Sequence, residues 1–427
     1  MWKWPFEFDA VAATLATCLL TGAIAAAEEP LRPVRLVAAV DRVQPMTGIV
    51  LWDDADGVET DAIQLEFSYL RYDEIVRGAE EYDWSVVDRK LEAIAGRGHQ
   101  AIFRFYDTYP GRESSAPRHI KALPDYRETN APSEGQPTGF PDWSHAGYQQ
   151  FVLEFYDRFA ERYDDDPRLA FLQVGFGLWS EYHIYDGPEI LGRTFPSKEF
   201  QAEFLKRMAE RFPQTAWMIS IDAADADRTP LANTAALRSL PFGLFDDSLL
   251  CREHARENEP NWNVFGRDRW RRAPAGGEFS YYTEHDQQQA LAPRGPHGVP
   301  FERAAAKFHI SFVIGSDQPQ HAGWKRIREA GLACGYRIRV ERFESADGRS
   351  LVVVANSGVA PIYYDAWPAV DGVRSETSLR GLLPGERREF RTASGGAAPR
   401  LTIECDRLSP GQAIGFDAQL TADGAAR

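Results

Sequence analysis

Two glutamates stand in sequence surroundings that suit acid–base or nucleophilic chemistry. Glu181 lies among aromatic side chains in the segment 179–183 (Trp-Ser-Glu-Tyr-His), and Glu278 follows the pair Gly276-Gly277. Glycines let the backbone approach another group closely, and an apolar surround favours the neutral, acidic form of a carboxyl group. Two carboxyl groups whose pKa values differ can act as acid and nucleophile across a cleft. The pair therefore predicts hydrolysis of a glycosidic bond, if the fold brings the two side chains together.

The elements that must position these glutamates alternate between strand and helix, most clearly between residues 62 and 106. The segments 62–71 and 100–106 are rich in residues that strands prefer. Between them, apolar residues recur three or four positions apart from Trp84 to Ile94, as on one face of a helix. A strand, a helix and a second strand in this order predict a parallel sheet.

The same alternation continues along the chain and predicts eight strands before residue 335. Their ranges are 48–52, 62–71, 100–106, 169–176, 215–222, 240–244, 276–279 and 308–314. Eight strands with intervening helices predict an α/β fold of the (β/α)₈ TIM-barrel type, in which catalytic groups lie just past the carboxyl ends of the strands. Glu181 follows the fourth strand and Glu278 ends the seventh, so a barrel would bring both to one face.

Three regions are predicted along the 427 residues. Residues 1–27 have the pattern of a signal peptide, because an apolar, alanine-rich run ends in small residues, and we expect cleavage after Ala27. Residues 28–334 would form the barrel. Residues 335–427, with short strand patterns and no helical stripe, would form a C-terminal all-β sandwich. The protein is therefore expected to be secreted or periplasmic, with no integral membrane span after signal cleavage.

Charge and residue spacing exclude several function classes. The chain has 63 acidic and 48 basic side chains and a net charge of −15, which argues against nucleic acid as a partner. The 9 His residues show no paired-ligand spacing, so neither a metal nor another cofactor is predicted. The Cys residues left after signal cleavage allow at most one disulfide. Aromatic residues make up 12% of the chain, which suits a cleft that stacks on sugars, and a carbohydrate substrate is the expected partner.

Further side chains near the predicted strand ends are candidates for substrate binding. Each has a structural alternative: an Arg can hold a neighbouring carboxylate, an Asp can cap the next helix, and an aromatic ring can be core packing. Helix capping is the preferred interpretation of Asp247, and Glu284 competes with Glu278 for the role at the seventh strand. The candidates are Arg71, Arg104, Trp179, His183, Asp222, Asp246, Tyr281 and Trp324.

Several segments resemble known protein families. Residues 81–84 (Glu-Tyr-Asp-Trp) and 101–105 (Ala-Ile-Phe-Arg-Phe) resemble the second-helix, third-strand region of clan A glycoside hydrolases, such as the β-galactosidases. A closer likeness, over nearly the whole mature chain, is to a family of secreted bacterial barrel proteins of unknown function. The segments similar to that family's motifs are 175–183, 276–278, 335–337 and 354–363.

The resemblance implies roles for the two glutamates. In clan A enzymes the acid/base Glu follows strand four and the nucleophile Glu follows strand seven, which implies that Glu181 and Glu278 have these roles in a retaining hydrolase of a poly- or oligosaccharide. Clan A enzymes usually carry Asn directly before the acid/base, where this chain has Ser180. This departure leaves open a non-catalytic glycan-binding or polysaccharide-assembly protein of the cell envelope. A purely structural envelope protein is a third alternative, which an occluded barrel mouth would support.

Overall fold

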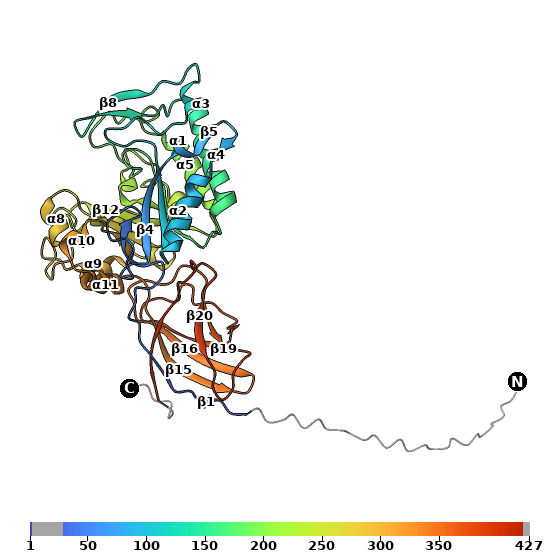
Figure 1. Cartoon of the computed structure of the whole chain (residues 1–427). Helices are drawn as coiled ribbons and strands as arrows, with labels where there is room; N and C mark the ends of the chain where they lie inside the picture. The colour runs from blue at the N-terminus through green and yellow to red at the C-terminus, as the bar shows by residue number, and fades with distance from the viewer. Residues whose placement is uncertain (2–28, 422–427) are drawn as a thin grey trace, which may run out of the picture. The chain divides into compact units, whose positions relative to one another are not determined.

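The computed structural model describes residue 1 and residues 29–421. The predicted signal peptide and its cleavage site fall on residues outside this described part. Within residues 29–421, a closed barrel of eight parallel strands precedes a region made only of strands and turns (Figure 1). The predicted fold, a (β/α)₈ barrel followed by a C-terminal β region, is confirmed.

The barrel strands follow one another in space in the order of the chain. Every neighbouring pair is parallel, and the last strand pairs with the first to close the barrel. In chain order the strands are β3 (Gly48–Trp52), β4 (Leu65–Arg71), β7 (Gln100–Tyr106), β10 (Leu169–Gln173), β11 (Ala216–Ser220), β12 (Gly243–Leu249), β13 (Ala275–Phe279) and β14 (Ile310–Ile314).

The sixth barrel strand was predicted too early in the chain. Residues 240–244 were expected to form it, whereas β12 begins at Gly243 and continues through Asp246 and Asp247. Buried partners explain how an aspartate fits inside a barrel strand. Asn258 donates a hydrogen bond to Asp246 Oδ1 over 2.8 Å, and the Trp262 indole donates to Oδ2 over 3.1 Å.

Helices follow most of the barrel strands. None of the described residues between β3 and β4 is helical, and the longest helices flank β10. The helices are α1 (Tyr72–Ile75), α2 (Ser85–Gly96), α3 (Arg118–Lys121), α4 (Ala146–Tyr163), α5 (Lys198–Arg211), α6 (Ala235–Arg238), α7 (Asn258–Val264), α8 (Glu284–Gln289), α9 (Phe301–Phe308), α10 (Gln318–His321) and α11 (Trp324–Leu332), with 3₁₀ turns η1 (Ile221–Ala224) and η2 (Arg269–Arg271).

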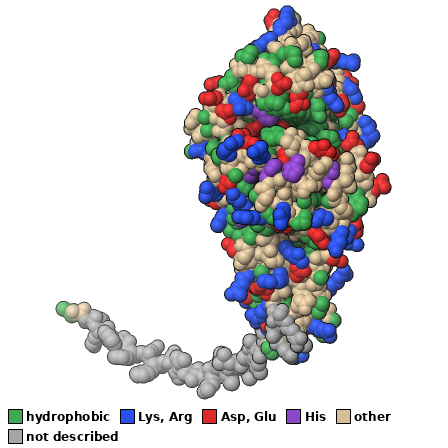
Figure 2. Space-filling view, turned by 90° about the vertical axis from the view of Figure 1, so that its left-hand side faces the viewer, with side chains coloured by type: hydrophobic (Ala, Val, Ile, Leu, Met, Phe, Trp, Pro, Cys, Tyr) green, Lys and Arg blue, Asp and Glu red, His purple; other side chains and the backbone are tan. Residues whose placement is uncertain are grey.

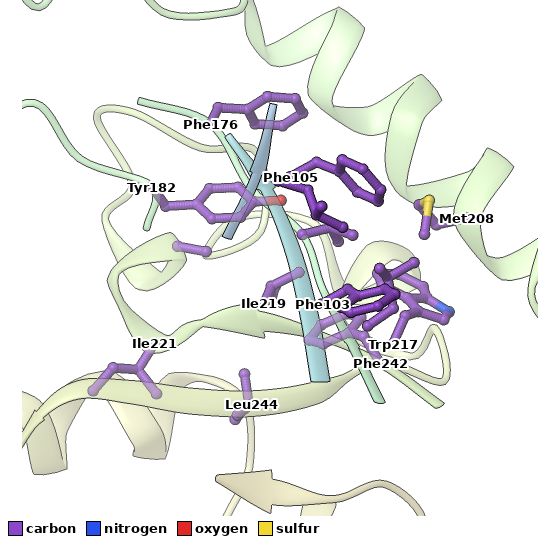
Figure 3. Packing of buried hydrophobic residues seen from close by; sticks show 14 of the residues in the cluster. Phe103, Phe105, Phe176, Tyr182, Met208, Trp217, Ile219, Ile221, Phe242 and Leu244 are labelled. Atoms are coloured by element: carbon purple, nitrogen blue, oxygen red, sulfur yellow. The ribbon is translucent and has the colours of Figure 1, made fainter. Parts of the chain in front are cut away.

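Aromatic packing holds the helices onto the barrel. In α4, Phe155 and Phe159 lie one turn apart, and their ring centroids lie 4.8 and 5.1 Å from that of Phe105 on β7. Figure 3 shows Met208 of α5 projecting towards the side chains carried by the strands, among them Trp217. Each such side chain contributes roughly 1.5–3 kcal/mol when it is fully buried. These contacts pack helices against β7 and β11, the two neighbours of β10 in the barrel.

The C-terminal β region has two sheets and a hydrophobic cluster of its own. Two short strands between residues 32 and 38, which the sequence did not predict, pair with this region. The predicted domain boundary at 334/335 stays a prediction. The larger sheet contains β1 (Arg32–Pro33), β2 (Leu36–Ala38), β15 (Ile338–Ala346), β16 (Arg349–Asn356), β19 (Arg387–Thr392) and β21 (Phe416–Leu420), and the smaller one contains β17 (Trp367–Val370), β18 (Val373–Arg374) and β20 (Leu401–Glu404).

The long segment 112–143 is partly ordered as a hairpin. Strands β8 (Thr129–Ser133) and β9 (Gln136–Phe140) pair antiparallel, in addition to the small pair β5 (Val76–Gly78) and β6 (Glu81–Tyr82) elsewhere. Figure 1 shows the β8 hairpin as an extension beyond the barrel strands. Within residues 29–421, no helix is both long and apolar enough to cross a membrane.

Candidate active site

A pocket of about 840 Å³ opens at the carboxyl ends of the barrel strands. Figure 2 shows acidic, His and hydrophobic side chains close together around a hollow on one face of the molecule. An active site at this end is typical of TIM barrels. The pocket is lined by Trp52, Tyr69, Tyr109, Glu134, Trp179, Glu181, His183, Tyr185, Asp222, Arg228, Asp247, Ser248, Glu278, Tyr281 and Tyr282.

The structure brings most of the predicted site residues together. The pocket walls include both glutamates and four of the substrate-binding candidates: Trp179, His183, Asp222 and Tyr281. A fifth candidate, Arg104, is fully buried and contacts Glu181 from behind the wall. The segment 250–274, between β12 and β13, contributes no residue to the lining.

Three candidates lie outside the pocket lining. Arg71 donates to the Asp73 carboxylate over 2.8 and 2.9 Å, the structural alternative weighed for it above. Asp246 is held beneath the pocket by Asn258 and other buried donors. Trp324 lies on α11, with its ring against Gly57 and 37% of its surface exposed.

Other residues of the pocket were missed by sequence reasoning or assigned differently. Asp247, interpreted as a helix cap, caps nothing: it lies inside β12, the next helix begins at Asn258, and the Asp247 side chain faces the pocket. Tyr69 is the third residue from the end of β4. Only knowledge of the barrel register could have shown that its side chain faces the pocket. Glu134 comes from the β8–β9 hairpin, whose approach to the strand ends no local pattern reveals.

The loop that carries Glu181 is tightly folded and tied to the neighbouring strand. Trp179, Ser180 and Tyr182 all have positive φ angles, of 52°, 60° and 67°. A β-carbon at Gly175 would lie 1.9 Å from the Ser180 carbonyl oxygen, so glycine is required there. Non-glycine residues in this region cost about 1–3 kcal/mol each and cluster at functional sites. The loop is therefore held in a conformation that places Glu181 at the pocket.

Ser180 itself does not face the pocket. Its hydroxyl is buried and donates a hydrogen bond of 2.8 Å to the Phe105 carbonyl oxygen on β7. The Trp179 backbone N–H donates to the Thr108 carbonyl oxygen over 3.0 Å, which is a second tie between this loop and the segment after β7. Ser180 therefore anchors the loop, and its hydroxyl is not part of the pocket lining.

Glu181 is paired with a completely buried guanidinium group. The Arg104 Nη1 atom donates to Glu181 Oε1 and, over 3.0 Å, to the Tyr69 hydroxyl. The Arg104 Nε and Nη2 atoms both donate to Gln173 Oε1, over 2.8 and 2.6 Å. A buried charge is tolerable only when it is paired and hydrogen-bonded, and this network meets that condition.

Glu278 has no such partner. Within residues 29–421, no hydrogen bond or ion pair reaches its carboxyl group. The residue is nevertheless buried, with only 7% of its surface exposed. Burial and repulsion by Glu181 raise the pKa of Glu278 to about 8, with Arg104 opposing. Burial also raises the pKa of Glu181, but Arg104 and His183 oppose that shift. Both pKa values are therefore raised, and only Glu181 has a guanidinium group hydrogen-bonded to its carboxylate.

Opposite Glu181, His183 lies between two aspartates. Its Nδ1 atom is 2.8 Å from Asp222 Oδ2 and 3.8 Å from Asp247 Oδ2. One ligand atom from each of Glu181, His183 and Asp247 lies within 4.8 Å of the others, a spacing that a metal ion can bridge. Because these residues come from two different strand ends, their spacing in the sequence gave no sign of the cluster. The Arg104 guanidinium on Glu181 opposes a second positive charge at this point.

Aromatic side chains form much of the pocket wall. Trp179 and Tyr185 are stacked, with centroids 6.0 Å apart and planes at 23°, and Tyr109 meets the Trp179 ring edge-on. The Tyr185 hydroxyl bonds to Glu134 at the tip of the β8–β9 hairpin. Exposed rings beside hydrogen-bonding carboxylates suit sugar rings, which present apolar faces and hydroxyl edges.

Comparison with known proteins gives likenesses only at the level of folded structures. No family model and no curated protein matches the chain. Endo-glycoceramidase II from Rhodococcus sp. is 10% identical, with a TM-score of 0.43 over 85% of this chain and 100% of that one. A psychrophilic family 10 endo-β-1,4-xylanase is 11% identical, with a TM-score of 0.37 over 64% of this chain and 86% of that one.

A third likeness is to TtGalA, an α-galactosidase from Thermus thermophilus. It is 13% identical, with a TM-score of 0.37 over 72% of this chain and 64% of that one. All three neighbours are glycoside hydrolases by name. The barrel in this chain is established by its own strand order, and membership of the secreted family of unknown function stays a prediction.

Proposed function

We propose that this protein is a glycoside hydrolase that acts on a poly- or oligosaccharide, with Glu181 and Glu278 as the reacting pair. The observation that carries the proposal is the placement of two buried carboxyl groups, from the ends of the fourth and seventh barrel strands, in the wall of one aromatic pocket. Burial and their mutual repulsion favour one proton shared between the two sites, which is the state that acid and nucleophile catalysis needs.

In a retaining mechanism, the protonated carboxyl group gives its proton to the leaving oxygen while the ionised one attacks the anomeric carbon. The glycosyl–enzyme ester is then hydrolysed by a water molecule that the first residue, now ionised, deprotonates. Retention requires a separation of about 5–5.5 Å between the two carboxyl groups, and inversion about 6.5–9.5 Å. We propose retention, which follows from the resemblance to clan A enzymes.

The assignment of the two roles has two versions. The resemblance assigns the acid to Glu181 and the nucleophile to Glu278. The contacts favour the opposite order, because the Arg104 guanidinium is bonded to Glu181 and stabilises a negative charge there, whereas among the described residues Glu278 has no cationic partner bonded to it. We propose the opposite order, with Glu278 as acid and Glu181 as nucleophile.

The proposed activity is tested with a panel of polysaccharides and aryl glycosides. We expect the wild-type protein to hydrolyse at least one substrate, and both Glu181→Gln and Glu278→Gln to lose roughly a factor of 10² or more in kcat. Glu74→Gln is the matched control, because Glu74 is exposed on α1, away from the pocket lining. Unchanged turnover in either pocket variant would remove that glutamate from the mechanism.

A slow fluorinated substrate distinguishes the two role assignments. Such a sugar traps the ester on the nucleophile, and mass spectrometry of the digested protein identifies the labelled peptide. A label on Glu181 supports the order favoured by the Arg104 contact. A label on Glu278 restores the order implied by the resemblance.

A non-catalytic glycan-binding protein is the second candidate function. It is favoured by the orientation of Ser180, whose hydroxyl is bound to the Phe105 carbonyl and leaves the usual sugar contact unmade. This candidate predicts saturable glycan binding without hydrolysis of any glycan offered. The wild-type protein and both Glu→Gln variants would then bind the glycan with similar affinity.

We also propose that the protein is secreted or periplasmic, with residues 1–27 removed. The support is the apolar run and the small residues before Glu28 in the sequence. N-terminal sequencing of protein recovered from the medium or periplasm should begin at Glu28. Recovery of the full-length chain from the cytoplasm would contradict this proposal.

A further inference from the structure

The walls of the pocket carry an excess of acidic side chains, of which Glu278, with a pKa raised to about 8 by burial and Glu181, favours its protonated form at pH 7. Five carboxyl groups line it, whereas Arg228 is the one Lys or Arg side chain among the lining residues. Arg228 is already paired outside the lining, 2.7 Å from Asp225, and Arg104 behind the wall is paired with Glu181. A ligand with negative charge, such as a uronic acid or sulfated sugar, would be repelled.

Two of these acidic side chains, Asp222 and Asp247, lie beside His183. His183 Nδ1 contacts Asp222 Oδ2, and Asp247 Oδ2 lies 3.8 Å from the same Nδ1 atom. Asp222 has one further contact, from Asn261 over 3.4 Å, and the Asp247 carboxylate accepts from the Ser248 hydroxyl over 3.5 Å. No Lys or Arg within residues 29–421 forms an ion pair with either aspartate, and burial, together with the charges of Asp222 and Glu181, raises the pKa of Asp247 well above its ordinary value. A positive charge bound beside Asp247 would favour its ionised form.

A second observation points to a ligand at the same place. His183 is 92% buried, since 8% of its surface is exposed, and its Nε2 atom is buried with no hydrogen-bond partner among residues 29–421. Buried polar atoms in folded proteins almost always have a partner. A neutral ring that donates its Nδ1–H to Asp222 leaves Nε2 as a buried acceptor, which a substrate N–H or O–H reaches only when neighbouring side chains move aside.

We propose that Asp222, His183 and Asp247 form a subsite for a protonated amino group on the substrate sugar. An ammonium group has three N–H donors and one positive charge, which the two carboxylates accept, while the His183 ring accepts from the ammonium or an adjacent hydroxyl. This inference rests on the proposed function, because it names the class of sugar, an amino sugar with a free amine, that the pocket accepts.

A metal ion fits the same charge less well. The cluster that a metal would bridge includes Glu181, which already contacts the Arg104 guanidinium. A divalent cation at that point would lie close to a fixed positive charge in a poorly solvated site. An ammonium group bound between the two aspartates needs no contact with Glu181.

Binding of simple methyl glycosides tests the subsite without depending on turnover. The probes are the free-amine, N-acetyl and hydroxyl forms of a 2-substituted methyl glycoside, in both the gluco and galacto series, titrated calorimetrically into the full-length protein. We expect the free amine to bind roughly 10- to 100-fold more tightly than the other two forms in one series. Asp247→Asn and, separately, Asp222→Asn should reduce this preference to nearly one, and the exposed Asp125→Asn should leave it intact.

The outcomes separate this inference from the proposed function. Equal or weaker binding of the free amine, together with hydrolysis of a neutral glycan, overturns the amine subsite and leaves the hydrolase standing. Absence of both binding and hydrolysis overturns both. Titration with zinc, manganese and calcium chlorides covers the remaining occupant: tight metal binding that His183→Ala abolishes, with no amine preference in the wild type, assigns the cluster to a metal instead. Thermal unfolding of each variant confirms that losses are not caused by misfolding.

Discussion

Two buried glutamates on barrel strands have opposite surroundings. Glu66, the second residue of β4, has 0% of its surface exposed, and Glu278, near the end of β13, has 7%. The Oε1 atom of Glu66 accepts from Arg97 Nε over 2.8 Å and lies 2.7 Å from His99 Nδ1, while its Oε2 atom contacts Arg97 Nη2. Among the described residues, Glu278 has neither an ion pair nor a hydrogen bond at its carboxyl group.

The contrast distinguishes a carboxylate that stabilises the fold from one available for chemistry. Both oxygens of Glu66 have partners, so its carboxylate is held within a network of hydrogen bonds and ion pairs. Glu278 instead faces a cavity, and its burial favours a proton that a substrate can take up. Glu181 lies between these extremes, with one oxygen held by Arg104 and its residue in the pocket wall.

The largest expected effect comes from neutralising the two glutamates in turn. Glu66→Gln removes the carboxylate partner of the partly exposed Arg97 and a charged acceptor of the buried His99, and should lower the free energy of unfolding by roughly 1.5–3 kcal/mol. Glu278→Gln removes no partner, so its free energy of unfolding at pH 7 should be equal to or higher than that of the wild type. Urea unfolding at pH 7, with the same slope for all three proteins, measures both differences.

The two substitutions should affect activity in the opposite order to stability. Folded Glu66→Gln should keep wild-type kcat, because Glu66 does not line the pocket, whereas Glu278→Gln should lose activity. A Glu278→Gln protein that is destabilised as much as Glu66→Gln would mean that Glu278 has a structural role. The distinction between the two surroundings would then be wrong.

A smaller effect concerns the pH dependence of stability. The pKa of Glu278 is about 8 in the folded protein and lies near 4.5 in the unfolded chain, so between these values the folded state binds more protons. Stability from this group is therefore highest at low pH and falls as the pH rises through this window. From pH 6 to pH 8, Glu278 should remove about 2 kcal/mol from the free energy of unfolding of the wild type.

Glu278→Gln is the variant that isolates this contribution. Its free energy of unfolding should fall less steeply from pH 6 to pH 8 than that of the wild type, with all other titrating groups in common. Parallel pH profiles for the two proteins would show that Glu278 is ionised throughout and would remove the argument that it serves as the acid.

Much of the barrel could be predicted because its signals are local. Each strand is a short apolar run, and the helix of Trp84 to Ile94 repeats every three or four residues. Counting strands then placed Glu181 and Glu278 at the same end of the barrel. The sixth strand was predicted too early because Asp246, whose charge suggests a strand end, is hydrogen-bonded to Asn258 within the fold.

The rest of the site depends on contacts that no local pattern contains. Arg104 was a candidate for substrate binding, yet its partners Glu181 and Gln173 are 77 and 69 positions away in the chain. His183, Asp222 and Asp247 come from the ends of three different strands and meet only when the barrel closes. Glu134 reaches the pocket on the β8–β9 hairpin, for which the sequence analysis predicted no strands.

The smallest expected effect is at the pocket rim, where a polar contact is exposed to solvent, unlike the buried contacts of Glu66. The Tyr185 hydroxyl bonds to Glu134, but 62% of the Tyr185 surface is exposed. Tyr185→Phe should change the free energy of unfolding by less than about 1 kcal/mol, because water replaces the lost partner. It keeps the ring stacked on Trp179 but frees the tip of the β8–β9 hairpin, so sugar affinity should fall several-fold at unchanged kcat.

Glu134→Gln, which retains a hydrogen-bond acceptor, should keep most of that affinity in the same calorimetric titration. If both variants lose affinity equally, the charge of Glu134, rather than the position of the hairpin, contacts the sugar.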